Sequence, residues 1–163
     1  MGLPYITPDK LTKSYSTIGE SGCSRCGELR TDGSGVFALF KLGDASILPA
    51  SLVNKIYISA YSYPDITVRV DNSGKNNIGV IQSYADTITI GKYIWVCIRG
   101  LSPKKVTYFE LGVAGVSVGD TMQSFGSGIT TTGASTIYQY ISLVAAAQFA
   151  TTTEKVLIVR PGA

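Results

Sequence analysis

The sequence predicts an all-β protein, a small β-barrel or β-sandwich with an extended N-terminal arm. From Val36 onward, short runs of β-branched and aromatic residues alternate with turn residues at close spacing, which is typical of sandwiches and barrels. No segment carries a sustained apolar stripe at the helical period of 3.6 residues. Strands and helices also do not alternate as they do in parallel α/β folds, which again favours a sandwich or a barrel.

Residues 1–35 differ from the rest of the chain because they show no periodicity. They contain Pro4 and Pro8 and only single apolar residues, which are Leu3, Tyr5, Ile6, Leu11 and Tyr15. We therefore expect residues 1–35 to form an extended arm and residues 36–163 to form one β-domain, a size that suits a single core. Such an arm can lie across a neighbouring copy or add a strand to an exposed sheet edge.

The expected strands follow from the β-type runs. They are Val36–Leu42, Ile56–Tyr61, Ile66–Val70, Ile78–Ile81, Thr87–Ile90, Tyr93–Arg99, Val106–Phe109, Ile137–Val144 and Val156–Val159. The run Ile66–Val70 alternates apolar and polar residues, which indicates a strand with one face in water.

The run Tyr93–Arg99 is apolar on both faces, so we expect it to be the central strand. Ile94, Val96 and Ile98 should lie on one side, with the side chains of residues 93, 95 and 97 on the other. Gly91-Lys92 should join it to Thr87–Ile90 through a type II′ hairpin turn. The glycine-rich residues 111–135 should be turns between short strands, and Ala145–Phe149 should form at most one helical turn.

The charge content predicts association. Charged residues make up only 15% of the chain, and a surface poor in charge tends to associate with copies of itself or with another protein. The net charge of +3 is spread along the chain, so nucleic acid is not an expected partner. No apolar run is long enough for a membrane helix and the N-terminus does not look like a signal peptide, so we expect synthesis in a cytoplasm.

Histidine is absent, which removes the usual general base and the commonest metal ligand. The run Gly115-Val116-Ser117-Val118-Gly119 matches the nucleophile-elbow pattern, but that pattern needs a histidine partner and a strand-turn-helix context. We interpret Ser117 as a turn residue and expect a protein that is not an enzyme and has no cofactor.

Three cysteines occur, two of them in the run Cys23-Ser24-Arg25-Cys26. A structural zinc site needs four ligands, and only Cys97 could add a third sulfur. Plain thiols are the favoured interpretation of Cys23 and Cys26. A disulfide, or a metal site shared between copies, remains an alternative.

Tyr57, Tyr61 and Tyr63 concentrate aromatic rings in a short stretch. Tyrosine is common on strands and at protein interfaces, so we expect sheet-surface packing or an interface here. A platform for binding sugars is the alternative.

The order of several short motifs resembles that of the decoration, or cement, proteins of tailed-bacteriophage heads. Gly turns lead into an aromatic strand over residues 27–40, Ile78–Ile81 follows, and then Gly91–Gly100. A V-x-x-G-D element at Val116–Asp120 comes next, and a closing strand at Val156–Val159 ends the series. The resemblance spans most of the chain, but the arm, the C-x-x-C run and the Tyr-rich stretch depart from it.

The resemblance implies a virion protein that sits in many copies, often as trimers, on the outer surface of a phage head. There it would bind the major capsid protein and cement adjacent capsid subunits, which stabilises the expanded shell. We expect Leu3, Tyr5, Ile6, Leu11 and Tyr15 to be contact residues, together with the three tyrosines named above. The alternatives are a carbohydrate-binding or receptor-binding virion module, or a tail or head-fibre component.

Overall fold

The computed structural model describes residues 2–43, 55–62, 65–71, 79–83, 88–104, 106–109, 117–125, 128–131, 140–143 and 151–159. Within these ranges the chain is all-β, as predicted, with one four-residue helix. The elements are α1 (Pro8–Leu11), β1 (Leu29–Thr31), β2 (Gly35–Leu42), β3 (Lys55–Ser62), β4 (Asp65–Asp71), β5 (Gly79–Ile81), β6 (Tyr93–Leu101), β7 (Val106–Phe109), β8 (Thr121–Phe125), β9 (Gly128–Thr131), β10 (Tyr140–Ser142), β11 (Thr151–Glu154) and β12 (Val156–Ile158). None of the described helical segments is long and apolar enough to cross a membrane.

Five strands close into a ring. The order is β2-β4-β3-β5-β6, and β6 pairs back onto β2. The β2–β4 pair is parallel and the other four pairs are antiparallel. A closed ring leaves none of these five strands as an open edge, so this half of the molecule is a small barrel.

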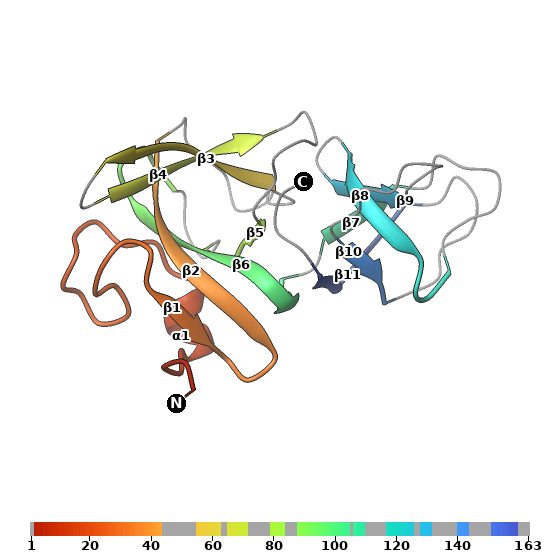
Figure 1. Cartoon of the computed structure of the whole chain (residues 1–163), viewed down its shortest axis with the longest axis horizontal. Coiled ribbons are helices and arrows are strands. Elements are labelled where there is room, and N and C mark those ends of the chain that lie inside the picture. Colours follow the sequence, from red (N-terminus) through yellow and green to blue (C-terminus); the bar gives the residue numbers. More distant parts are fainter. Residues whose placement is uncertain are drawn as a thin grey trace.

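Of the remaining strands, β1 pairs with β2, and the other six form a second group in the order β12-β10-β8-β9-β7-β11. This group joins the barrel where β12 pairs with the end of β6, at Leu101 and Gly100. Figure 1 shows β7 to β11 gathered on one side of the molecule, and β1 to β6 with α1 on the other.

The two faces of β2 and β6 are buried in two different cores. Ala38, Phe40 and Leu42 of β2 pack with Ile94 and Val96 of β6 inside the ring. The alternate residues of the same strands pack on the outer face; they are Phe37, Leu39, Tyr93, Trp95 and Cys97. The predicted division of the central strand into two buried faces is therefore confirmed.

Several other local predictions need correction. Thr89 accepts a hydrogen bond from the backbone N–H of Lys92, so the turn spans residues 89–92 and Gly91, with φ +87°, is its third residue. The predicted type II′ turn is therefore wrong, since it would place Gly91 second. The expected strand over residues 87–90 is reduced to a bridge at Ile88 in the described part. The sequence-based strands also omitted β1 and β11, did not place β8 or β9, and continued β10 past Ser142 to Leu143. Residues 137–139 and 144–149 lie outside the described ranges.

Candidate interaction surface

The N-terminal segment, defined here as residues 2–15, packs on the outer face of the barrel. Ile6, Leu11 and Tyr15 are only 1%, 2% and 4% exposed, and they join Trp95 and Phe37 in the outer core. This corrects the prediction of an exposed, extended arm at these three positions, because within one chain their side chains belong to the core. The outer faces of β2 and β6 are apolar, and the segment that packs on them removes this apolar surface from water, which stabilises the fold.

Backbone hydrogen bonds hold the segment at both ends. Near its start, the Ile6 N–H donates to the Thr31 carbonyl and the Thr31 N–H donates to the Pro4 carbonyl, which makes a parallel bridge between Tyr5 and Thr31. Near its end, Tyr15 and Tyr93 exchange two hydrogen bonds of 2.9 and 2.8 Å in an antiparallel bridge. The segment thus pairs with β1 of its own chain through a single parallel bridge, where the sequence predicted an added strand.

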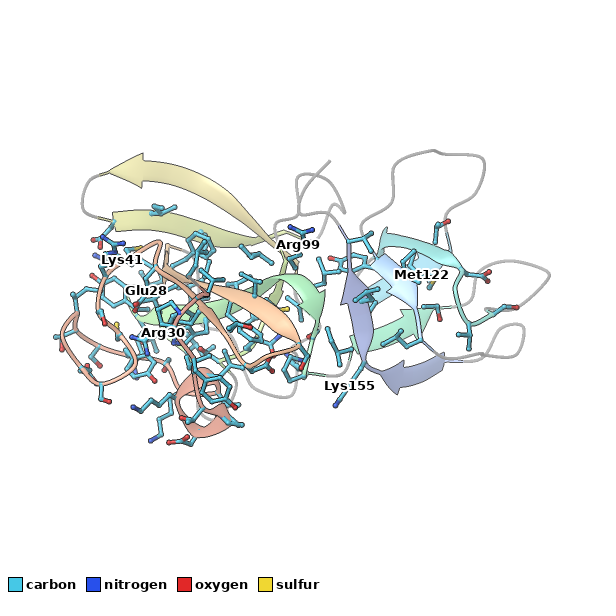
Figure 2. The ribbon with its side chains drawn as sticks, turned by 60° about the horizontal axis from the view of Figure 1, so that its bottom comes forward. Glu28, Arg30, Lys41, Arg99, Met122 and Lys155 are labelled. Atoms are coloured by element: carbon cyan, nitrogen blue, oxygen red, sulfur yellow. The ribbon has the colours of Figure 1, made fainter. Side chains whose placement is uncertain are left out.

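The loop that follows the segment is fixed by polar contacts around Trp95. The Trp95 indole N–H donates to the Gly22 carbonyl at 3.0 Å, and the guanidinium of Arg30 lies 5.6 Å from the centre of the Trp95 ring. Arg30 also pairs with Glu28 at 3.2 Å and donates to the Ser24 hydroxyl at 3.0 Å. Figure 2 shows Glu28 and Arg30 on the barrel side, away from Met122 and Lys155 of the second group.

Exposed apolar side chains concentrate at the two ends of the N-terminal segment. Leu3 and Tyr5 are 40% and 61% exposed, and Leu29 of the neighbouring β1 is 41% exposed. At the other end, Ile18 and Ile90 are 40% and 63% exposed. Of the predicted contact residues in the segment, Leu3 and Tyr5 are therefore the two on the surface.

The tyrosine stretch is only partly within the described residues. Tyr57 and Tyr61 lie on β3, where their backbones pair with Arg69 and Ile66 of β4. The pairing register shifts between Ile58 and Ala60, so a strand irregularity separates the two tyrosines. Tyr63 lies outside the described ranges.

All three cysteines are free thiols in the structure. Burial raises the pKa of Cys23 and of Cys97 to about 12, and it also raises the pKa of Cys26. Cys26 is held in place because its sulfur accepts the Ile66 N–H at 3.1 Å and lies within 3.6 Å of the Leu39 carbonyl oxygen. Within the described residues no group of three or more Cys, Asp or Glu is arranged to hold a metal.

A polar cluster lies where the barrel closes. The ammonium of Lys41 on β2 pairs with Asp65 of β4 at 2.9 Å, and the Tyr93 hydroxyl of β6 donates to the same carboxylate at 3.1 Å. The bond to Asp65 raises the pKa of Lys41, and burial together with that carboxylate raises the pKa of Tyr93. These shifts favour a charged lysine and a neutral tyrosine at neutral pH, a pattern that fits a structural joint between three strands.

A second polar cluster lies at the end of β6. The Gln82 amide donates to the Ser102 hydroxyl at 2.9 Å and accepts the Lys104 backbone N–H at 3.3 Å. Gln82 and Ser102 are both buried. Burial also lowers the pKa of the Lys104 side chain to about 7. These hydrogen bonds satisfy the buried polar atoms of Gln82 and Ser102, which is the usual role of such a network.

Ser117 of the nucleophile-elbow pattern lies in an exposed turn. Its backbone N–H donates to the Asp120 carboxylate at 2.7 Å, and the following Gly119 N–H donates to the Ser142 carbonyl at 2.8 Å. Val118 at the tip of this turn is 67% exposed. The described part of this pattern is thus a turn joined to β10, as the turn interpretation of Ser117 predicts.

No family model matches the sequence, and no curated protein matches it. Among solved structures, the crystal structure of the head fiber gp8.5 N base in bacteriophage phi29 is similar, with a TM-score of 0.44 and 9% sequence identity. The match covers 78% of this chain and 96% of that chain. At this identity and TM-score, nothing about the function of this chain follows from the likeness.

Proposed function

We propose that this chain is a structural protein of a tailed-phage virion that binds the outer surface of the head. In this proposal it contacts the major capsid protein, cements adjacent capsid subunits and stabilises the expanded shell. It acts as an oligomer, for which a homotrimer is the expected state, and it performs no catalysis. Synthesis takes place in the host cytoplasm and the final location is the capsid surface.

One observation carries the proposal: four of the five motifs that resemble decoration proteins come together in space, while the described part of the fifth lies in the turn next to β10. The glycine turns and aromatic strand form β1 and β2, the second motif lies on β5, and the third forms the turn and strand of β6. In the sheet β2 and β5 both pair with β6, and β12, which carries the closing motif, pairs with the end of β6. Motifs far apart in sequence thus build one contiguous part of the fold, which is expected if their order reflects a shared architecture.

The surface supports a binding role. Leu3 and Tyr5 project from the end of a sheet that is otherwise tied down by backbone hydrogen bonds. Tyrosine in particular is enriched at protein interfaces and at their hot spots. A protein that binds only the expanded shell stabilises that shell through linkage, and many copies on one lattice multiply the effect of each modest contact.

Binding to phage heads tests the proposal directly. Purified protein is mixed with unexpanded and with expanded heads of the phage that encodes it, and the bound protein is measured after sedimentation. We expect saturable binding to expanded heads and much weaker binding to unexpanded heads. Equal binding to both would remove the cementing mechanism, and binding to neither would contradict the head-binding role itself.

Surface substitutions then locate the contact. Tyr5→Ala and Leu3→Ala should weaken binding to expanded heads without changing the fold, because both side chains are exposed. Tyr57→Ala and Tyr61→Ala test the tyrosine stretch in the same assay. Loss of glycan binding on the tyrosine substitutions, with head binding unchanged, would favour the carbohydrate-binding alternative.

A further inference from the structure

We propose that the N-terminal segment is exchanged between copies of this chain, so that residues 2–15 of one copy cover the barrel of a neighbour. This inference concerns contacts between copies and goes beyond binding to a head. It commits to a second copy of the chain as the partner. Within one chain the segment already packs on the barrel, and the same contacts show how the segment of a second copy would bind there.

The surface that receives the segment is formed by β1, β2 and β6. The segment contacts this surface at a small number of separate points. Its side chains insert three anchors into the outer core, and its backbone forms one bridge at each end. Between the bridges, the Ser83 hydroxyl lies 3.4 Å from the Leu11 carbonyl and also accepts the Trp95 N–H at 2.9 Å. Each of these contacts forms equally well whichever copy supplies the segment, which is the condition for exchange.

The connection between the segment and the barrel is an exposed turn. Residues Ser16–Ser21 are exposed, and the Glu20 carboxylate accepts bonds from the backbone N–H groups of Ser16 and Thr17. Gly19 has φ +104° with open space around it. Contacts to Trp95 and Arg30 fix the chain again from Gly22 onward. When residues Ser16–Ser21 extend, they can act as a hinge between the N-terminal segment and the fixed barrel.

A second, independent observation favours the exchanged form. Five of the eight large apolar residues that are exposed in the described chain lie at the two ends of the segment. Ile18 follows Tyr15 by three residues and Ile90 precedes Tyr93 by three, so each exposed side chain lies close in sequence to one residue of the antiparallel Tyr15–Tyr93 bridge. Leu3 and Leu29 each lie two residues before the parallel bridge between Tyr5 and Thr31. Exchange brings two copies together at these ends and offers these side chains a partner.

A disulfide across the parallel bridge tests the exchange in the full chain. The double variant Tyr5→Cys/Thr31→Cys places two thiols on paired residues, and mild oxidation should link them. We expect disulfide-linked dimers and higher species on a denaturing, non-reducing gel. An oxidised product that runs only as a single chain, with its internal disulfide confirmed by mass spectrometry, would overturn the proposal.

Two controls remove other sources of linkage. The single variant Tyr5→Cys should give few dimers, because its own thiols do not face each other in the exchanged form. Mixing separately prepared Tyr5→Cys and Thr31→Cys chains by refolding them together should restore the linked species, since each then supplies one half of the bridge.

A second measurement uses the unmodified chain, in case the substitution at Thr31 disturbs folding. Unlabelled and ¹⁵N-labelled chains are refolded together and treated with a lysine cross-linker, and links between Lys13 and Lys92 are identified. These residues flank the Tyr15–Tyr93 bridge. Exchange predicts mixed-isotope pairs in about half of the links, because random mixing pairs unlike chains half of the time. Links found only between peptides of the same isotope would overturn the proposal, whatever the outcome of head binding.

Discussion

At the scale of single residues, the cysteines illustrate how burial overrides a local pattern. The C-x-x-C spacing invites a redox or metal interpretation, yet Cys23 is fully buried in the outer core and Cys26 is bonded to the β4 backbone. A thiol in such surroundings is a small apolar residue more than a reactive one. The spacing of the two cysteines reveals neither the burial of Cys23 nor the hydrogen-bond partners of Cys26.

Thiol reactivity checks this description. With a pKa of about 12 instead of about 9, the thiolate fraction of Cys23 and Cys97 at pH 8 falls about a thousandfold. We therefore expect slow labelling by a thiol reagent in the native protein and three rapidly labelled thiols after unfolding without reductant. Rapid native labelling of Cys23 would contradict its place in the core, and only one reactive thiol after unfolding would indicate that two of the three cysteines form a disulfide.

At the scale of elements, the N-terminal segment changes from a predicted arm to part of the core. The run from Pro4 to Tyr15 has too few apolar residues at any regular spacing to predict a strand or a helix. Thr7 and Pro8 nevertheless start the single turn of α1, because proline suits the first turn of a helix. The burial of Ile6 and Leu11 depends on the outer face of β6, which lies far away in sequence.

Two matched leucine substitutions test the role of the segment. Leu11→Ala removes a buried side chain and should lower the free energy of unfolding by about 3 kcal/mol, within the usual range for core leucines. Leu3→Ala, at an exposed position on the same segment, should change it by less than about 0.5 kcal/mol. Chemical denaturation measures both. Similar small effects would show that the segment is not part of the folded core.

Because the N-terminal segment is part of the core, deletion of residues 1–15 should affect stability as well as binding. For an extended arm, deletion weakens head binding and leaves the barrel intact. In the folded chain it also uncovers Trp95 and Phe37, so a loss of stability accompanies any loss of binding. Point substitutions at the exposed Leu3 and Tyr5 are therefore the better test of a binding role.

At the scale of the whole molecule, Gly100 lies at the junction between the barrel and the second strand group. It pairs with Gly35 of β2 and with Ile158 of β12, so β6 changes partners around it. Its φ is +82°, and a Cβ atom built there would lie 2.5 Å from the Ser34 carbonyl oxygen. Only glycine combines this backbone conformation with such a close approach. Figure 2 shows the neighbouring Arg99 between the two halves.

Substitution of Gly100 should destabilise the molecule more than the same substitution at Gly91. Gly100→Ala adds the steric conflict with Ser34 to the cost of a left-handed backbone, so we expect a loss of about 2 kcal/mol or more in the free energy of unfolding. Gly91→Ala is the matched control, because its φ is +87° and nothing lies within 4 Å of the added carbon. Equal losses in thermal or chemical unfolding would show that the close approach at the junction is unimportant.

Residue types and their spacing are enough to predict the all-β class, most strand positions in the barrel and the two buried faces of Tyr93–Arg99. These features depend on residue types and on an alternation of period two, which are local properties. The tertiary structure decided which strands close the ring, and that Ile6, Leu11 and Tyr15 belong to the core. Those outcomes depend on contacts between residues far apart in the chain, because the apolar outer face of β2 and β6 is buried by the N-terminal segment that packs on it.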